Sequence, residues 1–152
     1  PVSTDLFSED FSIFIWYKDV SNSKIPIFKL SDESNPTAST NEFIIYSNCD
    51  VKYGDIILNS RTIKSIGWRS LCVKKHENVL SVYLNTTLVS ISNDVDGKFV
   101  KNILNMLEIF PEPSNIFVDD LRIYNTDVNM SVVVDEFRRS YRYFNLTNSE
   151  CD

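Results

Sequence analysis

The sequence has few of the residues on which helices and nucleotide-binding loops depend. Only three glycines occur among its 152 residues, Gly54, Gly67 and Gly97, and they lie too far apart to form a glycine-rich phosphate loop. Ala38 is the single alanine, whereas isoleucine and asparagine each occur fifteen times. Because alanine is the best helix former and isoleucine is β-branched, this composition favours strands joined by polar loops. We therefore expect an all-β chain.

Cysteine and histidine are also scarce. The three cysteines, Cys49, Cys72 and Cys151, show none of the Cys/Cys or Cys/His spacings of zinc sites. Cys49 and Cys72 each lie beside a predicted strand and are the leading pair for a disulfide, with three reduced thiols as the alternative. His76 lies in a polar turn, and the chain has no Gly-x-Ser-x-Gly motif and no recognisable cysteine nucleophile motif. We interpret His76 as a solvated residue and not as a catalytic base.

Long apolar runs and excess positive charge are missing as well. No run approaches 18 apolar residues and no signal-peptide pattern is present, so we predict no membrane span in this segment. The chain begins at Pro1, without methionine, which suggests a piece excised from a longer protein. The formal net charge of −6 argues against nucleic-acid binding, and we interpret Arg138, Arg139 and Arg142 as solvated side chains of a strand, with a contact patch as the alternative. The length fits a single domain.

What the chain does contain is alternation of apolar side chains. Residues 11–18 carry large apolar groups on both faces, which predicts a central strand. One face holds Phe11, Ile13, Ile15 and Tyr17. Phe14 and Trp16 lie on the other face, where they would stack on a sugar or anchor a partner, and we take them as the candidate ligand-binding residues. The alternative is that a loop or neighbouring domain covers them, or that the faces are reversed.

Residues 115–124 alternate in the same way and predict a half-buried strand. Its apolar face is expected to hold Phe117, Leu121 and Ile123. Asp119 and Asp120 are adjacent, so they are expected to point to opposite faces and not to act as an acid and base pair. We expect Asp119 to accept hydrogen bonds from loop amides on the core side, and Asp120 to lie near Arg122 on the outer side.

Several further segments are predicted as strands. Pro26 predicts an edge or bulged position for the strand at 24–30, and 42–47 with 54–59 is expected to form a hairpin. Residues 99–110 satisfy both helical and strand spacing, and we favour a strand from 103 to 110. Three consecutive valines at 132–134 also favour a strand, because β-branched residues are stiff in helices. The other expected strands cover 68–75, 79–84 and 88–91.

Three of these patterns, in this order, resemble those of laminin-G-like and concanavalin A-like domains. Residues 11–18 are similar to the Phe-Thr-Ile-x-Phe-Trp-Val-Lys strand of that superfamily, Trp68 opens a strand similar to its Trp-His-hydrophobic strand, and 115–124 resembles its closing strand. The resemblance implies an antiparallel β-sandwich of the jelly-roll type with a core from about 11 to 143, in which Trp68 is structural. It also implies a recognition or adhesion module that binds a protein or glycan. The alternative is a structural domain that packs against other parts of its parent protein.

Glycosidases of the laminarinase type share this sandwich and carry a Glu-x-Asp-x-(x)-Glu strand, which this chain lacks. We therefore predict that the chain is not an enzyme. Some laminin-G-like domains hold calcium at a loop rim, and the stretch 93–97 faintly resembles a calcium loop but lacks the remaining ligands. We expect no cofactor, with calcium as the open alternative. The candidate calcium ligands are Asp50, Asp55, Asp94, Asp96 and Asp127.

Three N-glycosylation sequons begin at Asn85, Asn129 and Asn145. Together with a disulfide they would fit a secreted or cell-surface glycoprotein. Abundant isoleucine and asparagine with one alanine is also the composition that an AT-rich genome produces. We therefore expect an extracellular or surface location, on a parasite or a low-GC microbe.

Overall fold

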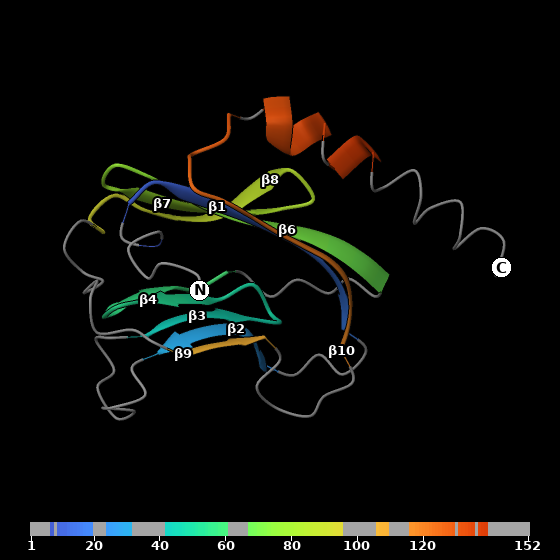
Figure 1. The fold of residues 1–152 in the computed structure, drawn as a ribbon, viewed down its shortest axis with the longest axis horizontal. Helices are drawn as coiled ribbons and strands as arrows, with labels where there is room; N and C mark the ends of the chain where they lie inside the picture. The colour runs from blue at the N-terminus through green and yellow to red at the C-terminus, as the bar shows by residue number, and fades with distance from the viewer. Residues whose placement is uncertain are drawn as a thin grey trace, which may run out of the picture.

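The protein folds as two antiparallel sheets packed face to face (Figure 1). The computed structural model describes residues 7, 9–19, 24–31, 42–60, 67–95, 106–109, 116–129, 131–135 and 137–139. The strands in these residues are β1 Phe11–Asp19, β2 Pro26–Ser31, β3 Phe43–Tyr46, β4 Val51–Tyr53, β5 Ile56–Leu58, β6 Gly67–His76, β7 Val79–Leu84, β8 Thr87–Ser92, β9 Met106–Ile109 and β10 Ile116–Tyr124.

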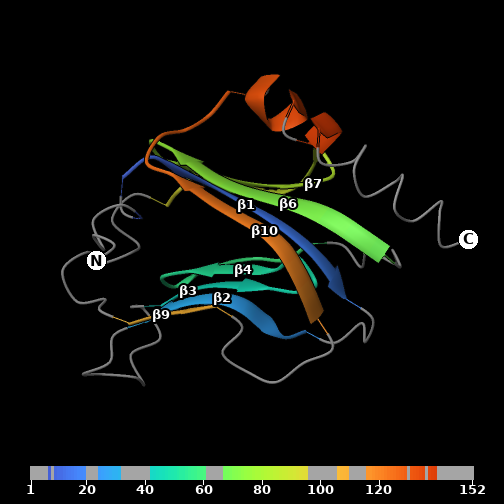
Figure 2. The same ribbon diagram turned by 45° about the vertical axis from the view of Figure 1, so that its right-hand side comes forward.

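Sheet A has the strand order β10-β1-β6-β7-β8 and sheet B the order β5-β4-β3-β2-β9. The two strands with the clearest sequence patterns, β1 and β10, lie side by side although they are far apart in the sequence (Figure 2). β1 is an interior strand between β10 and β6, as its apolar faces predict. The predicted all-β antiparallel sandwich is confirmed.

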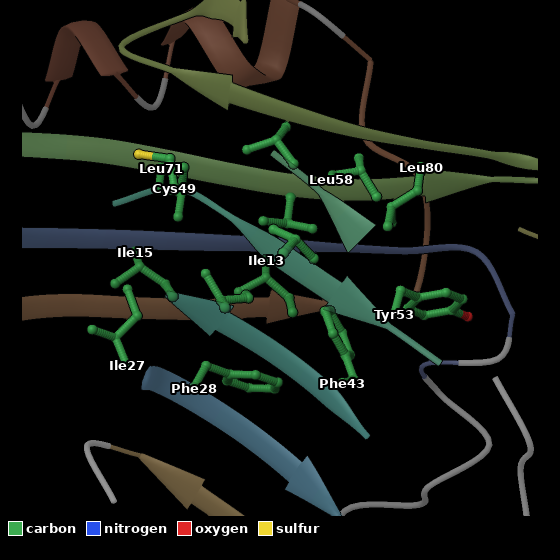
Figure 3. Packing of buried hydrophobic residues seen from close by; sticks show 14 of the residues in the cluster. Ile13, Ile15, Ile27, Phe28, Phe43, Cys49, Tyr53, Leu58, Leu71 and Leu80 are labelled. Carbon is green, nitrogen blue, oxygen red and sulfur yellow. The ribbon is translucent and has the colours of Figure 1, made fainter. Parts of the chain in front are cut away.

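The core lies between the sheets and is built by alternation. Ile13, Ile15 and Tyr17 of β1 point inward and are buried, as the sequence predicts. Leu71 and Leu80 enter the core from sheet A, and they face aromatic and aliphatic side chains of sheet B (Figure 3). We call the side of sheet A that faces sheet B its inner face, and the opposite side its outer face.

Phe7 also belongs to this core, although the first ten residues read as a polar lead-in. Its ring is fully buried and lies 5.5 Å from the ring of Phe11 and 5.7 Å from those of Phe28 and Phe43, in edge-on arrangements that aromatic pairs prefer. The hydroxyl of Tyr53 donates a hydrogen bond to the Phe7 carbonyl. Phe7, which precedes β1, is therefore part of the packing.

β10 contains a β-bulge that the sequence pattern did not reveal. Trp16 pairs with Asp120 and Tyr17 pairs with Val118, so Asp119 is an extra residue with no opposite partner on β1. The alternation consequently shifts by one position at Asp119. Leu121 packs against the core as expected, whereas Phe117 is 58% exposed. The expected core-facing position of Phe117 was wrong.

Residues 131–135 and 137–139 are helical, so the predicted strand at 132–134 was wrong. The helix begins after Asn129, whose carbonyl and side-chain Oδ1 both accept hydrogen bonds from the first helical amides. Val133 is buried against the outer face of sheet A. The cap and this tertiary contact outweigh the weak helix preference of valine. The helix lies across the outer face of sheet A (Figure 1).

Other strand predictions were partly right. The chain from 42 to 59 forms three strands, since β4 lies between the two that were expected. Pro26 begins β2 at a bulge but not at an edge, because β2 pairs with both β3 and β9. The predicted strand at 103–110 is present as β9, over Met106–Ile109, and residues 99–105 lie outside the described residues.

The turn between β7 and β8 contains Asn85 and Thr86, and both have positive φ, 48° and 73°. Two consecutive residues of this kind are typical of a type I′ hairpin turn. Threonine is branched at Cβ and is strained in this conformation. Thr86 therefore stores backbone strain at the tip of the hairpin.

The predicted Cys49–Cys72 disulfide is wrong, because both cysteines are free and buried. Cys49 precedes β4 and lies in the core between the sheets. Cys72 lies between the inward residues Leu71 and Val73 of β6 and so points to the outer face, where it contacts Phe14 and Val133. The two thiols are separated by sheet A itself. Cys151 lies outside the described residues.

Candidate functional site

The outer face of sheet A carries the residues from which a binding site was predicted. Antiparallel pairing places Phe14 opposite Cys72 and Trp16 opposite Ser70. Partners of this kind point to the same face of a sheet. The prediction that Phe14 and Trp16 share the face opposite to the core is therefore correct.

The helix covers Phe14 and Trp16, so the prediction that they form an exposed binding surface was wrong. Phe14 is 5% exposed and packs with Cys72, Val128 and Val133. Trp16 is 4% exposed, and its ring stacks on Phe137 at 5.9 Å with an interplanar angle of 11°. Neither ring offers the open surface that stacking on a sugar needs. The alternative, cover by a loop or neighbouring domain, was right that both rings are covered, but the cover is a helix of the same chain.

The segment between β10 and the helix is fixed to the sheet by polar contacts. The Ser12 hydroxyl donates to the carbonyl of Thr126 at 2.9 Å and accepts from the amide of Val128 at 3.0 Å. The Lys74 ammonium contacts Asp127 Oδ1 at 2.9 Å and donates to the Val128 carbonyl at 2.9 Å. These contacts hold the start of the helix on the outer face.

A second part of the outer face is partly exposed. Lys18 of β1 is opposite Phe117 of β10 on one side and opposite Trp68 of β6 on the other, so the three side chains form one row across three strands. Phe117 is 58% exposed, and Lys18 and Trp68 are partly exposed. We call these three residues the open row. Lys18 and Phe117 were missed as site residues, although Lys18 continues the alternation of Phe14 and Trp16 by two positions.

The two acids of β10 have different surroundings. Asp120 accepts a hydrogen bond from Arg122 Nε at 3.0 Å on the outer face, as predicted. Asp119 is exposed, so its expected position on the core side was wrong. The reason is the bulge, which removes Asp119 from the alternation of the strand.

His76 lies at the far end of sheet A from the open row. Its Nδ1 is 3.1 Å from Asp10 Oδ2 and 3.5 Å from Asp127 Oδ2, and its side chain is 59% exposed. The backbone amide of Glu77 donates to the other oxygen of Asp10 at 2.8 Å. The arrangement ties the turn between β6 and β7 to the segment before β1.

A buried polar cluster lies between the sheets at the other end. The Tyr17 hydroxyl donates to the Ser47 carbonyl at 2.9 Å and lies 3.4 Å from Cys49 Sγ, and the Arg69 guanidinium lies over the Tyr17 ring at 5.4 Å. Burial raises the pKa of the Tyr17 hydroxyl well above its usual value, and burial also raises the pKa of the Cys49 thiol. Both groups are therefore protonated at neutral pH, and Cys49 is not a thiolate nucleophile.

Among the residues that the structure describes, the candidate calcium ligands do not come together. Asp50 is buried, where it accepts from the Ser60 amide at 2.8 Å and pairs with Lys24 at 3.3 Å. Asp55 and Asp94 are exposed, and Asp96 lies outside the described residues. Within the part of the chain that the structure describes, no three acidic, histidine or cysteine side chains form a group that could hold a metal ion.

The sequons differ in their surroundings. The Asn85 side chain is partly buried, and its Oδ1 accepts a hydrogen bond from the Ser70 amide at 2.9 Å. Asn129 is exposed and caps the helix. Asn145 lies outside the described residues, and glycosylation at these sites stays a prediction.

Comparison with known proteins gives likenesses of fold. No protein-family model and no curated protein matches the chain. Among solved structures, a Trypanosoma rangeli sialidase in complex with 2,3-difluorosialic acid has a TM-score of 0.64 and 15% identity, over 87% of this chain and 23% of that one. The binding domain of botulinum neurotoxin DC in complex with SialylT has a TM-score of 0.61 and 14% identity, over 89% and 36%. The binding domain of Paraclostridial mosquitocidal protein 1 has a TM-score of 0.58 and 15% identity, over 88% and 38%.

These likenesses support a β-sandwich fold, and membership of the laminin-G-like or concanavalin A-like superfamily stays a prediction. The chain spans about a quarter to two fifths of the length of the proteins that it matches. The prediction that the chain is not an enzyme was wrong, because the proteins with similar folds include sialidases, which are enzymes. A missing laminarinase motif does not exclude other glycosidase chemistry. No helix in the described segments is long and apolar enough to cross a bilayer.

Proposed function

We propose that this domain recognises a carbohydrate, carried by a glycan or a glycosylated partner, as part of an extracellular or cell-surface protein. The observation that carries the proposal is the open row, where Phe117, which is 58% exposed, and Trp68 lie on either side of Lys18 on the outer face of sheet A. Aromatic rings offer an apolar surface for a sugar ring, and a neighbouring polar group fixes its orientation.

The likenesses of fold support the same proposal. One similar domain was solved with SialylT and one similar sialidase with 2,3-difluorosialic acid, so related sandwiches occur in proteins that bind saccharides. At 14 to 15% identity these likenesses concern the fold, and the assignment of a saccharide to this chain rests on its own surface.

A glycan array probed with the purified chain tests the proposal. Binding to a defined subset of saccharides is expected, and it should fall at least tenfold in a Phe117→Ser variant. Ile57→Ser is a matched control, because Ile57 is 59% exposed but belongs to sheet B. Absence of saccharide binding by the folded wild-type chain would contradict the proposal.

A second candidate function is packing against another domain or subunit. It is favoured by Leu88 and Ile91, which are 46% and 51% exposed on the edge strand β8. Exposed apolar groups on an edge strand favour association. Sedimentation velocity should then show concentration-dependent association that a Leu88→Ser, Ile91→Ser variant abolishes. A wild-type chain that stays monomeric at about 100 micromolar would count against self-association through this edge.

A further inference from the structure

The open row points to a charged ligand. We propose that it binds an acidic saccharide, with Lys18 contacting the carboxylate or sulfate and the rings of Phe117 and Trp68 contacting the sugar. This inference deepens the proposed carbohydrate recognition and depends on it.

The bulge at Asp119 creates the row. On the outer face, Arg122 lies opposite Phe14 and Asp120 opposite Trp16, and uninterrupted alternation would then place Val118 opposite Lys18 and turn Phe117 inward. The extra residue moves the register by one, so that Phe117 becomes the partner of Lys18. Bulges commonly redirect a side chain in this way beside functional sites.

The size of the row suits a saccharide. Paired side chains on adjacent strands have Cβ atoms about 5 Å apart, and the two outer strands of the row, β10 and β6, are about 10 Å apart. A cation at the centre, with an aromatic ring on each side, matches a sugar that carries one anionic group. Phe117 provides the most exposed of these surfaces.

Lys18 also differs from other lysines in its charge environment. Lys24, Lys29, Lys52 and Lys74 each lie within 4 Å of a carboxylate oxygen. Among the described residues, Lys18 forms no ion pair. An ammonium group without a carboxylate partner is available to an incoming anion, and charge-assisted hydrogen bonds are stronger than neutral ones.

The net charge of the chain makes this contact decisive. A formal charge of −6 creates a long-range field that does not attract anions. A preference for acidic over neutral saccharides must therefore come from a local contact. Removing the charge of Lys18 should abolish the preference without abolishing the stacking surface.

Isothermal titration calorimetry with three forms of one oligosaccharide tests the inference: neutral, carboxylated with a terminal sialic acid, and sulfated. The wild-type chain is expected to bind at least one acidic form about tenfold more tightly than the neutral form, which corresponds to about 1.4 kcal/mol. The acidic form that binds more tightly identifies the anionic group. Lys18→Gln should equalise acidic and neutral binding, and Lys18→Arg should keep the preference.

Lys29→Gln is the control, because it removes the same charge from sheet B. Thermal unfolding of each variant should show a folded protein. Equal wild-type affinity for the three forms, or a loss of preference in Lys29→Gln as large as in Lys18→Gln, would overturn the inference and leave carbohydrate recognition standing. Absence of binding to all three forms and to the glycan array would overturn both.

Discussion

Removal of the Phe137 ring should loosen the helix from sheet A. Phe137 stacks on Trp16 at 5.9 Å, and a stacked aromatic pair contributes about 0.5–1.5 kcal/mol beyond its buried area. Full burial of a phenylalanine side chain contributes about 1.5–3 kcal/mol, and Phe137 is only half-buried. We therefore expect Phe137→Ala to cost about 2 kcal/mol of helix docking, or about a 30-fold change in the docking equilibrium.

Fluorescence and hydrogen exchange measure this effect. In a Trp68→Phe background the emission comes from Trp16 alone, and it should move to longer wavelength when Phe137→Ala admits water to a ring that is now 4% exposed. Amides of residues 132–139 should exchange about 30-fold faster, whereas those of β1 and β6 should be much less affected. Phe117→Ala is the control and should change stability by less than about 0.5 kcal/mol, because Phe117 is exposed. Unchanged Trp16 emission and unchanged helix exchange in Phe137→Ala would refute the reasoning.

Three further predictions concern the sheet. Thr86→Gly should raise the free energy of unfolding by about 1 kcal/mol in urea titration, because glycine adopts the φ of 73° without strain; no gain would contradict a strained turn. Burial raises the pKa of Cys72 to about 12, so above pH 9 the unfolded state loses this proton first and stability should fall as pH rises towards 12. Cys72→Ala should make the urea midpoint fall less steeply with pH. An unchanged dependence of the midpoint on pH would argue against a raised pKa of Cys72. Ser12→Ala should cost about 1–3 kcal/mol, because the amide and carbonyl that it bridges lose their partner; a cost below about 0.5 kcal/mol in the same titration would show that water replaces it.

The sequence predicted the parts of the fold that depend on alternation alone. β1 was recognised as an interior strand because Ile13 and Tyr17 on one face and Trp16 on the other are all large and apolar. The pattern also placed Trp16 on the outer face. It could not show that Trp16 is buried there, because the covering ring of Phe137 is 121 positions further along the chain.

The wrong predictions arose where one residue interrupts the alternation of a strand, or where a tertiary contact outweighs a local structural preference. A bulge at Asp119 leaves little trace in composition, yet it reverses the face of Phe117. Valine at 132–134 favours a strand locally, but the Asn129 cap and the burial of Val133 make this segment helical. Prediction of the open row would have required the register between three strands, which the periodicity within each strand does not provide.

The dependence of sheet A on its covering helix limits where the polypeptide can be shortened. A version that stops at Tyr124 would keep all of the strands described above, yet Phe14, Trp16 and Cys72 would face water. Such a product would expose an apolar sheet surface and tend to precipitate, even though all of its strands were present. For this molecule the end of the last strand is not the end of the folding unit.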